Sequence, residues 1–307
     1  MDPAALLEEI RQRVLREARP DPRTAIDGLL LSRHQTTEPD YQLTEPLFIL
    51  MAQGGKRLYA GSDLVEYGPG QCLVVTTTLP LSGHFIDARP DHPALAVTLP
   101  LRAADIASLL PDLGRLPAVG MRTPGAAESA IGTLTADAAL LDAVARLLRP
   151  LDRPAQSGGH PGDAAVLAPM IRREILWRLL TGPAGPRIAR IGIADSSLVH
   201  VSRAIARIRE DYARPIPVPG LARTAGMSNS TFHRHFRAIT GMTPLQFQKL
   251  LQLQEARSLL LAGADDVTRV GQAVGYSSPT QFNREYRRLF GAPPGRDAAS
   301  LRRVVSG

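Results

Sequence analysis

The sequence predicts an α+β protein of about two domains, in which a β-rich N-terminal region precedes an all-α C-terminal region. Three observations indicate this class. Short apolar runs separated by glycine and proline turns occupy residues 40–100, a pattern typical of antiparallel strands. Helical periodicity begins at about residue 102. The last third holds two copies of one helical unit, which indicates a duplicated supersecondary structure.

The composition of the chain is that of a globular protein. Of its 307 residues, 44% are apolar and 21% are charged, which is ordinary for a folded chain. No stretch approaches the roughly 18 consecutive apolar residues that span a bilayer. The first residues, MDPAALLEEIRQRV, lack the basic and apolar regions of a secretory signal. We therefore expect a soluble, cytoplasmic protein with no membrane contact.

The N-terminal region predicts a helix, then strands, then further helices. Residues 1–20 place Leu6, Leu7, Ile10 and Val14 on one side of a helix. The strands that follow suggest a small antiparallel barrel or sandwich at about residues 25–100. Helices are expected at about 102–110, 137–149 and 164–180, with residues 149–163 as a loop rich in Gly and Pro.

An internal repeat dominates the C-terminal third. Residues 232–244 read FHRHFRAITGMTP and residues 282–294 read FNREYRRLFGAPP, so aromatic residues, arginines, a glycine and a proline match at a constant offset of 50. Each copy begins with a short apolar helix that ends at a glycine and is followed by a second helix. A helix, a short glycine-containing turn and a second helix make a helix-turn-helix unit. We place the two units at about residues 219–240 and 267–290.

Local signals mark where the second helix of each copy begins and ends. Gly226 and Gly275 can adopt the left-handed conformation that ends the first helix. Ser228 and Ser278 can cap the second helix, and Pro279 suits a first helical position. Aromatic residues four apart then define the buried side of that helix.

The opposite side of each second helix is polar, and it determines the predicted function. Its side chains are the kind of donors and acceptors that read base edges and hold phosphates. The candidate DNA-binding residues are Ser230, Thr231, His233, Arg234 and Arg237 in the first copy, and Thr280, Gln281, Asn283, Arg284, Arg287 and Arg288 in the second.

A long helix is expected between the two copies, over Pro244 to Leu261. Eighteen residues at a helical rise of about 1.5 Å span about 27 Å. Such a connector suits two reading helices about one DNA turn, ~34 Å, apart. One chain would then address two successive major grooves, and the duplex would have to bend to fit if it is not ideally straight.

The charge of the chain is concentrated in this same region. Residues 200–307 hold 16 Lys and Arg against 7 Asp and Glu, a net charge of +9, whereas residues 1–199 hold 20 against 22. A basic domain beside a nearly neutral one is typical of a domain that binds a polyanion. Basic surfaces also serve solubility. The positive charge therefore agrees with DNA binding by the repeated units but is weak evidence for it alone.

The C-terminal third resembles the DNA-binding domain of AraC/XylS-family transcription regulators. The resemblance is carried by GMSNSTFHRHFRAITGMTPLQF, by a linker helix containing EAR, and by VGYSSPTQFNREYRRLFGAPP, and it covers roughly residues 200–298. It implies base-reading helices at 229–237 and 279–287, with Arg234 and Arg284 in or beside the groove. Variable, specificity-setting positions would be held by Ser230, His233, Thr280 and Asn283. The linker departs from the family's usual Arg-Leu by having Gln252 and Leu253, so the arginine that the family has at the first of these positions is absent here.

The N-terminal two thirds resemble the domain that accompanies one subgroup of these regulators. The matching segments are EPLFILMAQGGKRLYAG, YGPGQCLVVTTTLPLSG and PMIRREILWRLLTGP. The resemblance implies a cupin-like β-barrel with flanking helices, in an effector-binding domain at residues 1–189 that precedes a DNA-binding domain at residues 190–307. It implies a transcription regulator that binds double-stranded promoter or operator DNA and is modulated by an unidentified small molecule. RNA polymerase and a second copy of the chain are further expected partners.

A cupin-type enzyme with an appended DNA-binding module is the alternative. Metal-dependent cupins need three or four converging ligands, usually starting from a His-x-His pair. The barrel segment has His84 and His92, with Asp87 and Asp91 near, and no His-x-His. The pair His233 and His235 lies two apart on a helix, where side chains do not share a face. We expect no catalytic residue, no metal and no cofactor.

Cys72 is the one cysteine of the chain. A single cysteine cannot form an internal disulfide. It also cannot supply the zinc-bound cysteine cluster of DNA-repair methyltransferases, some of which carry a related DNA-binding module. Cys72 lies in an apolar run, where a lone cysteine usually packs as a small hydrophobe. The alternative is a thiol sensor, which needs a lowered pKa and solvent access.

Overall fold

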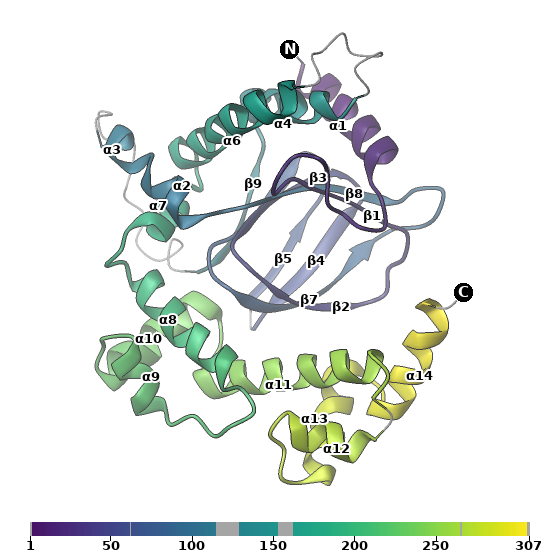
Figure 1. Cartoon of the computed structure of the whole chain (residues 1–307), viewed down its shortest axis with the longest axis vertical. Helices are drawn as coiled ribbons and strands as arrows, with labels where there is room; N and C mark the ends of the chain where they lie inside the picture. Colours follow the sequence, from purple (N-terminus) through teal and green to yellow (C-terminus); the bar gives the residue numbers. More distant parts are fainter. Residues whose placement is uncertain (1, 62, 115–128, 153–161, 265, 306–307) are drawn as a thin grey trace. The chain divides into compact units, whose positions relative to one another are not determined.

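The computed structural model describes residues 2–61, 63–114, 129–152, 162–264 and 266–305. It divides into two compact units, one with most of residues 1–199 and the other with most of residues 200–307. The first contains β-sheets and helices, and the second is helical (Figure 1). The α+β class is therefore confirmed. The predicted domain boundary between residues 189 and 190 stays a prediction.

The sheet-containing unit has two antiparallel sheets. One has the strand order β1-β8-β3-β6-β9 and the other the order β2-β7-β4-β5. The strands are β1 (Leu30–His34), β2 (Asp40–Thr44), β3 (Leu47–Gln53), β4 (Gly55–Ala60), β5 (Asp63–Tyr67), β6 (Gln71–Val75), β7 (Leu79–Ile86), β8 (Ala94–Pro100) and β9 (Ile131–Thr135).

The predicted barrel is not closed. Among the described residues, no strand pairing joins the two sheets, which makes this part a two-sheet structure. Closure requires ladder hydrogen bonds between edge strands. The four edge strands, β1, β9, β2 and β5, are each five residues long, and short edges are a common way to limit further pairing. Side chains of the two sheets are in contact, because the ring of His34 at the end of β1 stacks on the ring of Phe85 of β7, with 4.3 Å between the centroids.

Alternation along the strands decides which side chains face the interior. In β4, Lys56, Leu58 and Ala60 are buried, whereas Tyr59 between them is exposed. Such period-two burial is expected of a sheet with one covered face.

Strand β9 lies outside the predicted strand region of about 25–100. It pairs with β6 but buries only Ile131 of its five residues, so its apolar signal is weak.

Helices accompany the sheets of this unit. The predicted N-terminal helix is present, with Leu6, Ile10 and Val14 buried, and it packs against α4. Helix α4 also packs against α6, so α1, α4 and α6 form a layer of helices along one side of the sheets (Figure 1). The predicted loop at 149–163 lies mostly outside the described residues. The helices are α1 (Pro3–Glu17), α2 (Ala103–Ala107), α3 (Leu110–Leu113), α4 (Ala138–Leu148), the 3-10 helix η1 (Arg149–Leu151), α6 (Asp163–Thr181) and α7 (Gly185–Gly192).

The helical unit includes both predicted helix-turn-helix units. Helix α14 was not expected: Pro294 does stop the preceding segment, but it also begins this new helix, as Pro244 begins α11. The helices are α8 (Ser197–Glu210), α9 (Val218–Thr224), α10 (Asn229–Thr240), α11 (Pro244–Leu261), α12 (Val267–Ala273), α13 (Pro279–Phe290) and α14 (Pro294–Val305).

Candidate nucleic-acid interface

The first helix-turn-helix unit consists of α9, a tight turn and α10. Gly226 takes a φ of +64° in the turn, a conformation that favours glycine. The backbone N–H of Thr231 donates to Ser228 Oγ at 3.4 Å, as the predicted cap requires. Phe232 and Phe236 are fully buried, with ring centroids 5.4 Å apart. Their burial fixes which side of α10 remains for solvent.

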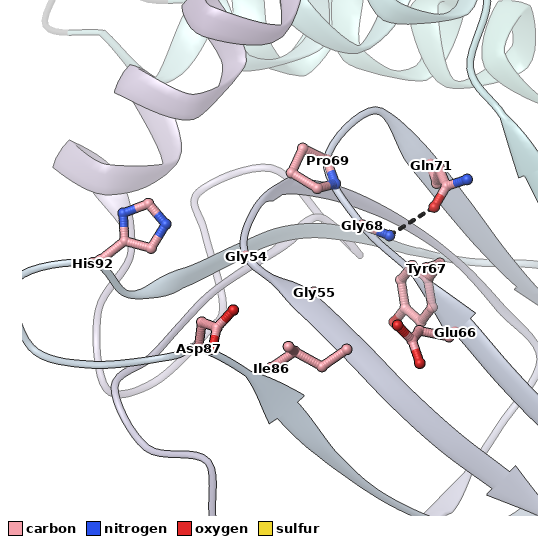
Figure 2. Close-up of a pocket in the computed structure, with 10 residues that line it drawn as sticks. All are labelled: Gly54, Gly55, Glu66, Tyr67, Gly68, Pro69, Gln71, Ile86, Asp87 and His92. Carbon is pink, nitrogen blue, oxygen red and sulfur yellow. Dashed lines mark hydrogen bonds between the residues drawn. The ribbon is translucent and has the colours of Figure 1, made fainter.

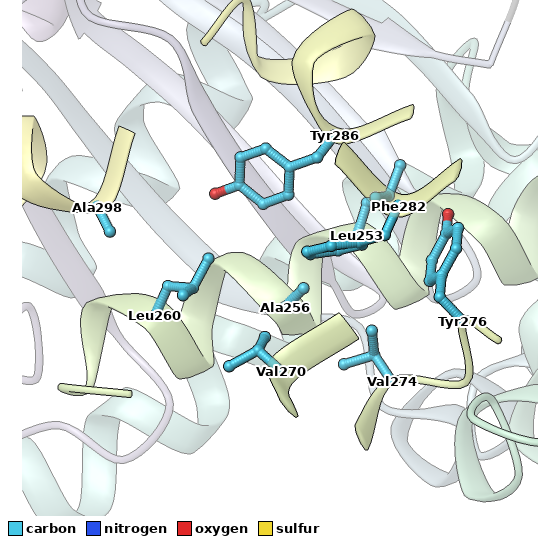
Figure 3. Close-up of a cluster of buried hydrophobic side chains, with 9 residues drawn as sticks. All are labelled: Leu253, Ala256, Leu260, Val270, Val274, Tyr276, Phe282, Tyr286 and Ala298. Carbon is cyan, nitrogen blue, oxygen red and sulfur yellow. The ribbon is translucent and has the colours of Figure 1, made fainter. Parts of the chain in front are cut away.

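The second helix-turn-helix unit repeats this plan with α12, a turn and α13. Gly275 has a φ of +97°, and the N–H of Gln281 donates to Ser278 Oγ at 3.3 Å. Phe282 and Tyr286 are fully buried within a cluster that brings α11, α12, α13 and α14 together (Figure 3). The members of that cluster are Leu253, Ala256, Leu260, Val270, Val274, Tyr276, Phe282, Tyr286 and Ala298.

Helix α11 belongs to the cores of both helix-turn-helix units. Near its start, the ring of Phe247 packs edge-on against Phe236 at 5.7 Å. Further along, it contributes to the cluster of the second unit. A capping box defines its beginning, because Thr243 Oγ1 accepts from the N–H of Gln246 and Gln246 Oε1 accepts from the N–H of Thr243. The 18 residues span about 27 Å, so the helix acts as a rigid spacer between the two units.

The predicted DNA-binding side chains lie on the side of α10 and α13 opposite to the buried aromatic rings. Thr231 and Gln281 are half-buried. The others are exposed, namely Ser230, His233, Arg234, Arg237, Thr280, Asn283, Arg284, Arg287 and Arg288. This geometry suits DNA contact, but no observation tests the contact itself, so the set stays a prediction.

Some of these side chains already have partners. Asn283 Nδ2 donates to the carbonyl oxygen of Pro279 at 2.8 Å. Thr231 Oγ1 accepts from Ser228 Oγ at 3.0 Å. Within the described part of the chain, the five arginines of the set form no ion pair, so their guanidinium groups are available to phosphates and to guanine edges.

A buried carboxylate on α13 was missed by sequence reasoning. Glu285 accepts hydrogen bonds from Lys249 Nζ (2.8 and 3.0 Å), Tyr276 Oη (2.8 Å) and Gln281 Nε2 (3.0 Å). Burial opposes ionisation of Glu285, but the bonds from Lys249, Gln281 and Tyr276 outweigh it and lower its pKa to about 2. Lys249 and Glu285 are 36 residues apart, so no local pattern could have paired them.

A second buried network explains the arginine of the linker helix. The Arg257 guanidinium makes two hydrogen bonds to the Asp297 carboxylate, at 2.9 and 3.2 Å, and Tyr286 Oη donates to the same carboxylate at 2.9 Å. Both partners of the ion pair are largely buried. Arg257 therefore ties α11 to α14 within the helical unit.

The sheet-containing unit offers a pocket of about 510 Å³ (Figure 2). Asp87 and His92 lie on one side of it, Glu66 and Pro69 on the other, and Gly55 lies between them. Asp87 has a φ of +58°, which is uncommon for a residue other than glycine.

Cys72 is not among the residues that line this pocket. It is fully buried in β6, where burial raises the pKa of its thiol. That environment disfavours the thiolate that a sensor would need.

The residues weighed for a cupin-type metal site do not converge in the structure. His84 is half-buried on β7, whereas His92 and Asp91 are exposed beyond its end. Among the described residues, no three His, Cys, Asp or Glu side chains are grouped to hold a metal ion. None of the described helices has the length and hydropathy needed to cross a bilayer.

Two family models match the chain. The model described as AraC-type transcriptional regulator N-terminus matches residues 25–187, and the model described as helix-turn-helix domain matches residues 221–299. The first covers just over half of the chain.

Among curated proteins, the chain is similar to the HTH-type transcriptional activator RhaS of Escherichia fergusonii, at 32% identity over 110 residues, which is 34% of this chain and 38% of that protein. It is also similar to the HTH-type transcriptional regulator CdhR of Pseudomonas aeruginosa, at 34% identity over 112 residues, which is 36% of this chain and 32% of that protein. The match thus spans about a third of the length of these relatives.

Among solved structures, the chain is similar to ToxT from Vibrio cholerae in its form with an unsaturated fatty acid bound. The TM-score is 0.54 at 9% identity, over 90% of this chain and 96% of that chain. Another ToxT structure from Vibrio cholerae gives a TM-score of 0.53 at 10% identity, over 88% of this chain and 97% of that chain. At such identity the likeness concerns the fold, which ToxT and this chain share along nearly their whole length.

Proposed function

Because the chain belongs to the family of AraC-type transcriptional regulators, we propose that it is a sequence-specific, double-stranded DNA-binding regulator of bacterial transcription. One observation carries the proposal. Two helix-turn-helix units share the central helix α11, and each presents an exposed arginine-bearing face on its second helix. This is the arrangement by which one chain places two reading helices in successive major grooves.

Side-chain position separates the arginines that would contact phosphates from those that would contact bases. Arginines such as Arg237 and Arg287 would hold phosphates, whereas Arg234 and Arg284, nearer the middle of their helices, would reach base edges. Helix α11 spans about 27 Å, which is shorter than one turn of straight DNA, ~34 Å. Simultaneous contact by both helices therefore favours a bent duplex.

The sheet-containing unit would carry the response to a small molecule. The pocket beside Gly55 has room for a small ligand, and the fold neighbour ToxT has been solved with an unsaturated fatty acid bound. An effector changes DNA binding only if its affinity differs between two states of the protein. We propose an effector of unidentified chemistry, a cytoplasmic location beside the chromosome, and both a second copy of the chain and RNA polymerase as partners at the promoter.

We infer that the chain is not an enzyme, because its family consists of transcriptional regulators. The cupin-type enzyme remains testable in its own right. Elemental analysis of the purified protein for transition metals checks it: a stoichiometric metal would favour the enzyme, and a sub-stoichiometric content would favour the regulator.

The experiment that tests DNA binding is selection of sites from random duplexes with the full chain, followed by titration at several salt concentrations. The logarithm of affinity should fall with the logarithm of salt concentration by about 0.9 per neutralised phosphate. Arg234→Ala and Arg284→Ala should each lose about 1–3 kcal/mol of specific binding. Arg296→Ala is the matched control, since Arg296 is exposed on α14 outside the reading helices. Wild-type affinity in both reading-helix variants would contradict the proposal.

A further inference from the structure

Residues 211–214, which follow α8 and precede α9, are bonded to the middle of the linker helix α11. Gln248 Nε2 donates to the carbonyl oxygens of Tyr212 and Arg214, at 2.9 and 2.6 Å. Gln252 Nε2 donates to the same carbonyl oxygen of Tyr212 at 2.8 Å. Both glutamine side chains are buried, where an amide needs such partners. Four residues apart, the two glutamines share one face of α11 and hold a single short segment.

The same segment contacts the turn of the second helix-turn-helix unit. A β-carbon at Gly275 would overlap the carbonyl oxygen of Ala213, so this turn approaches residues 211–214 as closely as only a glycine allows. The half-buried ring of Tyr212 packs against the hydrophobic cluster of that unit. Residues 211–214 are therefore fixed to the second unit by backbone contact and ring packing as well as by their bonds to α11.

The first helix-turn-helix unit is joined to this segment through a proline tract. Helix α9 begins at Val218, after only Pro215, Ile216 and Pro217. Proline fixes φ at about −65°, so such a tract has little freedom. A pocket of about 330 Å³ is lined by residues of α8, of the tract and of α9, so the three lie side by side. The tract and residues 211–214 thus form a second connection between the two units, separate in the chain from α11.

A second connection constrains what α11 alone leaves free. The length of α11 sets the distance between the units, but apolar packing near its two ends is not directional, so the units could still tilt about it. Half-sites on DNA must match the reading helices in rotation as well as in distance. With about 10–10.5 base pairs per turn, each added pair rotates one half-site by about 35°. A connection that fixes the tilt therefore also fixes the spacing that both helices can read.

We propose that Gln248 and Gln252 determine the spacing between half-sites that the protein accepts. By tying residues 211–214 to α11, they hold α10 and α13 in one relative orientation. Linked reading helices strengthen each other only when both can bind at once, so a fixed orientation makes binding tight at one spacing and weak at others. The glutamines are positioning residues, since both are buried and belong to α11 rather than to a reading helix. This inference rests on the DNA-binding function proposed above.

A series of DNA sites with altered spacing tests the proposal. A site is selected from random duplexes with the full chain, and Arg234→Ala and Arg284→Ala assign each half of it to one reading helix. Base pairs are then inserted or removed between the halves, one and two at a time, and the affinity is measured at constant salt. For the wild-type chain, a change of one base pair should lower the affinity by at least about tenfold.

Gln248→Ala combined with Gln252→Ala frees residues 211–214 and should relax this requirement. The penalty for one base pair should fall below about threefold, while the base preference within each half stays as in wild type. The matched control is Gln246→Ala, which removes a bond at the start of α11 and leaves the bonds to residues 211–214 intact. The control should keep the wild-type penalty, and a relaxed control would overturn the proposal.

Pro215→Gly combined with Pro217→Gly is an independent variant that decides the matter if the glutamine variant does not fold. It keeps both glutamines and loosens the chain between residues 211–214 and α9, so its penalty should also fall below about threefold. A wild-type penalty in either variant, with affinity lowered equally at every spacing, would overturn the proposal. A wild-type chain that selects a site but binds every spacing equally would contradict this proposal alone. A wild-type chain that selects no sequence would instead contradict the DNA-binding function itself.

Discussion

The two helix-turn-helix units share one backbone plan but are held together by different chemistry. In the first, the packing of α10 rests on the apolar rings of Phe232 and Phe236 against Phe247. In the second, a tyrosine, Tyr286, takes the place of the second phenylalanine, and its hydroxyl donates to Asp297. A buried tyrosine needs such a partner.

The difference shows which features a helical repeat must keep. The spacing of the aromatic rings, the glycine turn and the serine cap recur in both copies, because they define the angle between the two helices. The buried polar groups differ, since each needs partners from elements outside the repeat, here α11 and α14. The second unit is therefore tied to its neighbours by directional bonds, and in the first the rings of Phe232 and Phe236 pack with Phe247 of α11.

The largest expected effect on stability comes from removing the buried aromatic ring that both helix-turn-helix units share. Phe232→Ala and Phe282→Ala each remove a fully buried ring, and each should lower the free energy of unfolding by about 3–5 kcal/mol. Chemical denaturation of the full chain measures both. Similar losses would support equivalent cores. A loss below about 1 kcal/mol in either variant would contradict the burial of that ring.

Asp297→Ala should come next and should affect the second unit alone. It leaves the Arg257 guanidinium and the Tyr286 hydroxyl without their acceptor, at an expected cost of about 2–4 kcal/mol. Tyr286→Phe removes only the hydroxyl and should cost about 1 kcal/mol. Denaturation curves compare the two. Equal costs would show that the ion pair with Arg257 contributes nothing.

Acid should weaken the second unit through Glu285. Its pKa is lowered from 4.5 to about 2, because bonds from Lys249, Gln281 and Tyr276 overcome the opposing effect of burial. A lowered carboxylate pKa stabilises the fold fully above the unfolded pKa, and the stabilisation is lost as the pH falls below about 4.5 towards 2. Thermal unfolding measured across that range should show a steeper decline for wild type than for Glu285→Gln. Parallel curves would contradict the role of Glu285.

The smallest effects are expected at the helix caps, where the two units should again be alike. Ser228→Ala and Ser278→Ala each remove the acceptor of one helix-start hydrogen bond, at a cost of about 1 kcal/mol. The melting temperatures of the two variants provide the measurement. A shift in only one of them would show that the caps are not equivalent.

The parts of the fold that could be predicted from the sequence are those marked by a local sequence pattern. Helix α11 was predicted with the bounds that it has in the structure, Pro244–Leu261, and a proline suits the first position of a helix. The strands β3, β6 and β8 were recognisable as apolar runs between turns. The open arrangement of the two sheets was not predictable, because it depends on which strand edges pair over long distances in the chain. Strand β9 escaped because its two apolar residues, Ile131 and Leu134, are three apart and do not alternate as in a half-buried strand.

The candidate interface was predictable to a similar extent. Alternation of aromatic and polar residues was enough to predict the faces of α10 and α13, since helical period alone decides which side chains face away from the core. The partner of Arg257 was not predictable. Asp297 lies 40 residues from Arg257, so no local pattern pairs them. Glu285 lies four residues from Gln281 on the same helix, and that spacing is the signal that could have found this pair.

The most direct test of the account is methylation interference at guanine N7 on a selected DNA site bound by the full chain. Methylation at N7 blocks major-groove contacts. We predict two clusters of interference about one helical turn apart on one face of the duplex, one lost in Arg234→Ala and the other in Arg284→Ala. A single cluster, or two clusters that neither variant alters, would contradict the claim that α10 and α13 are paired reading helices.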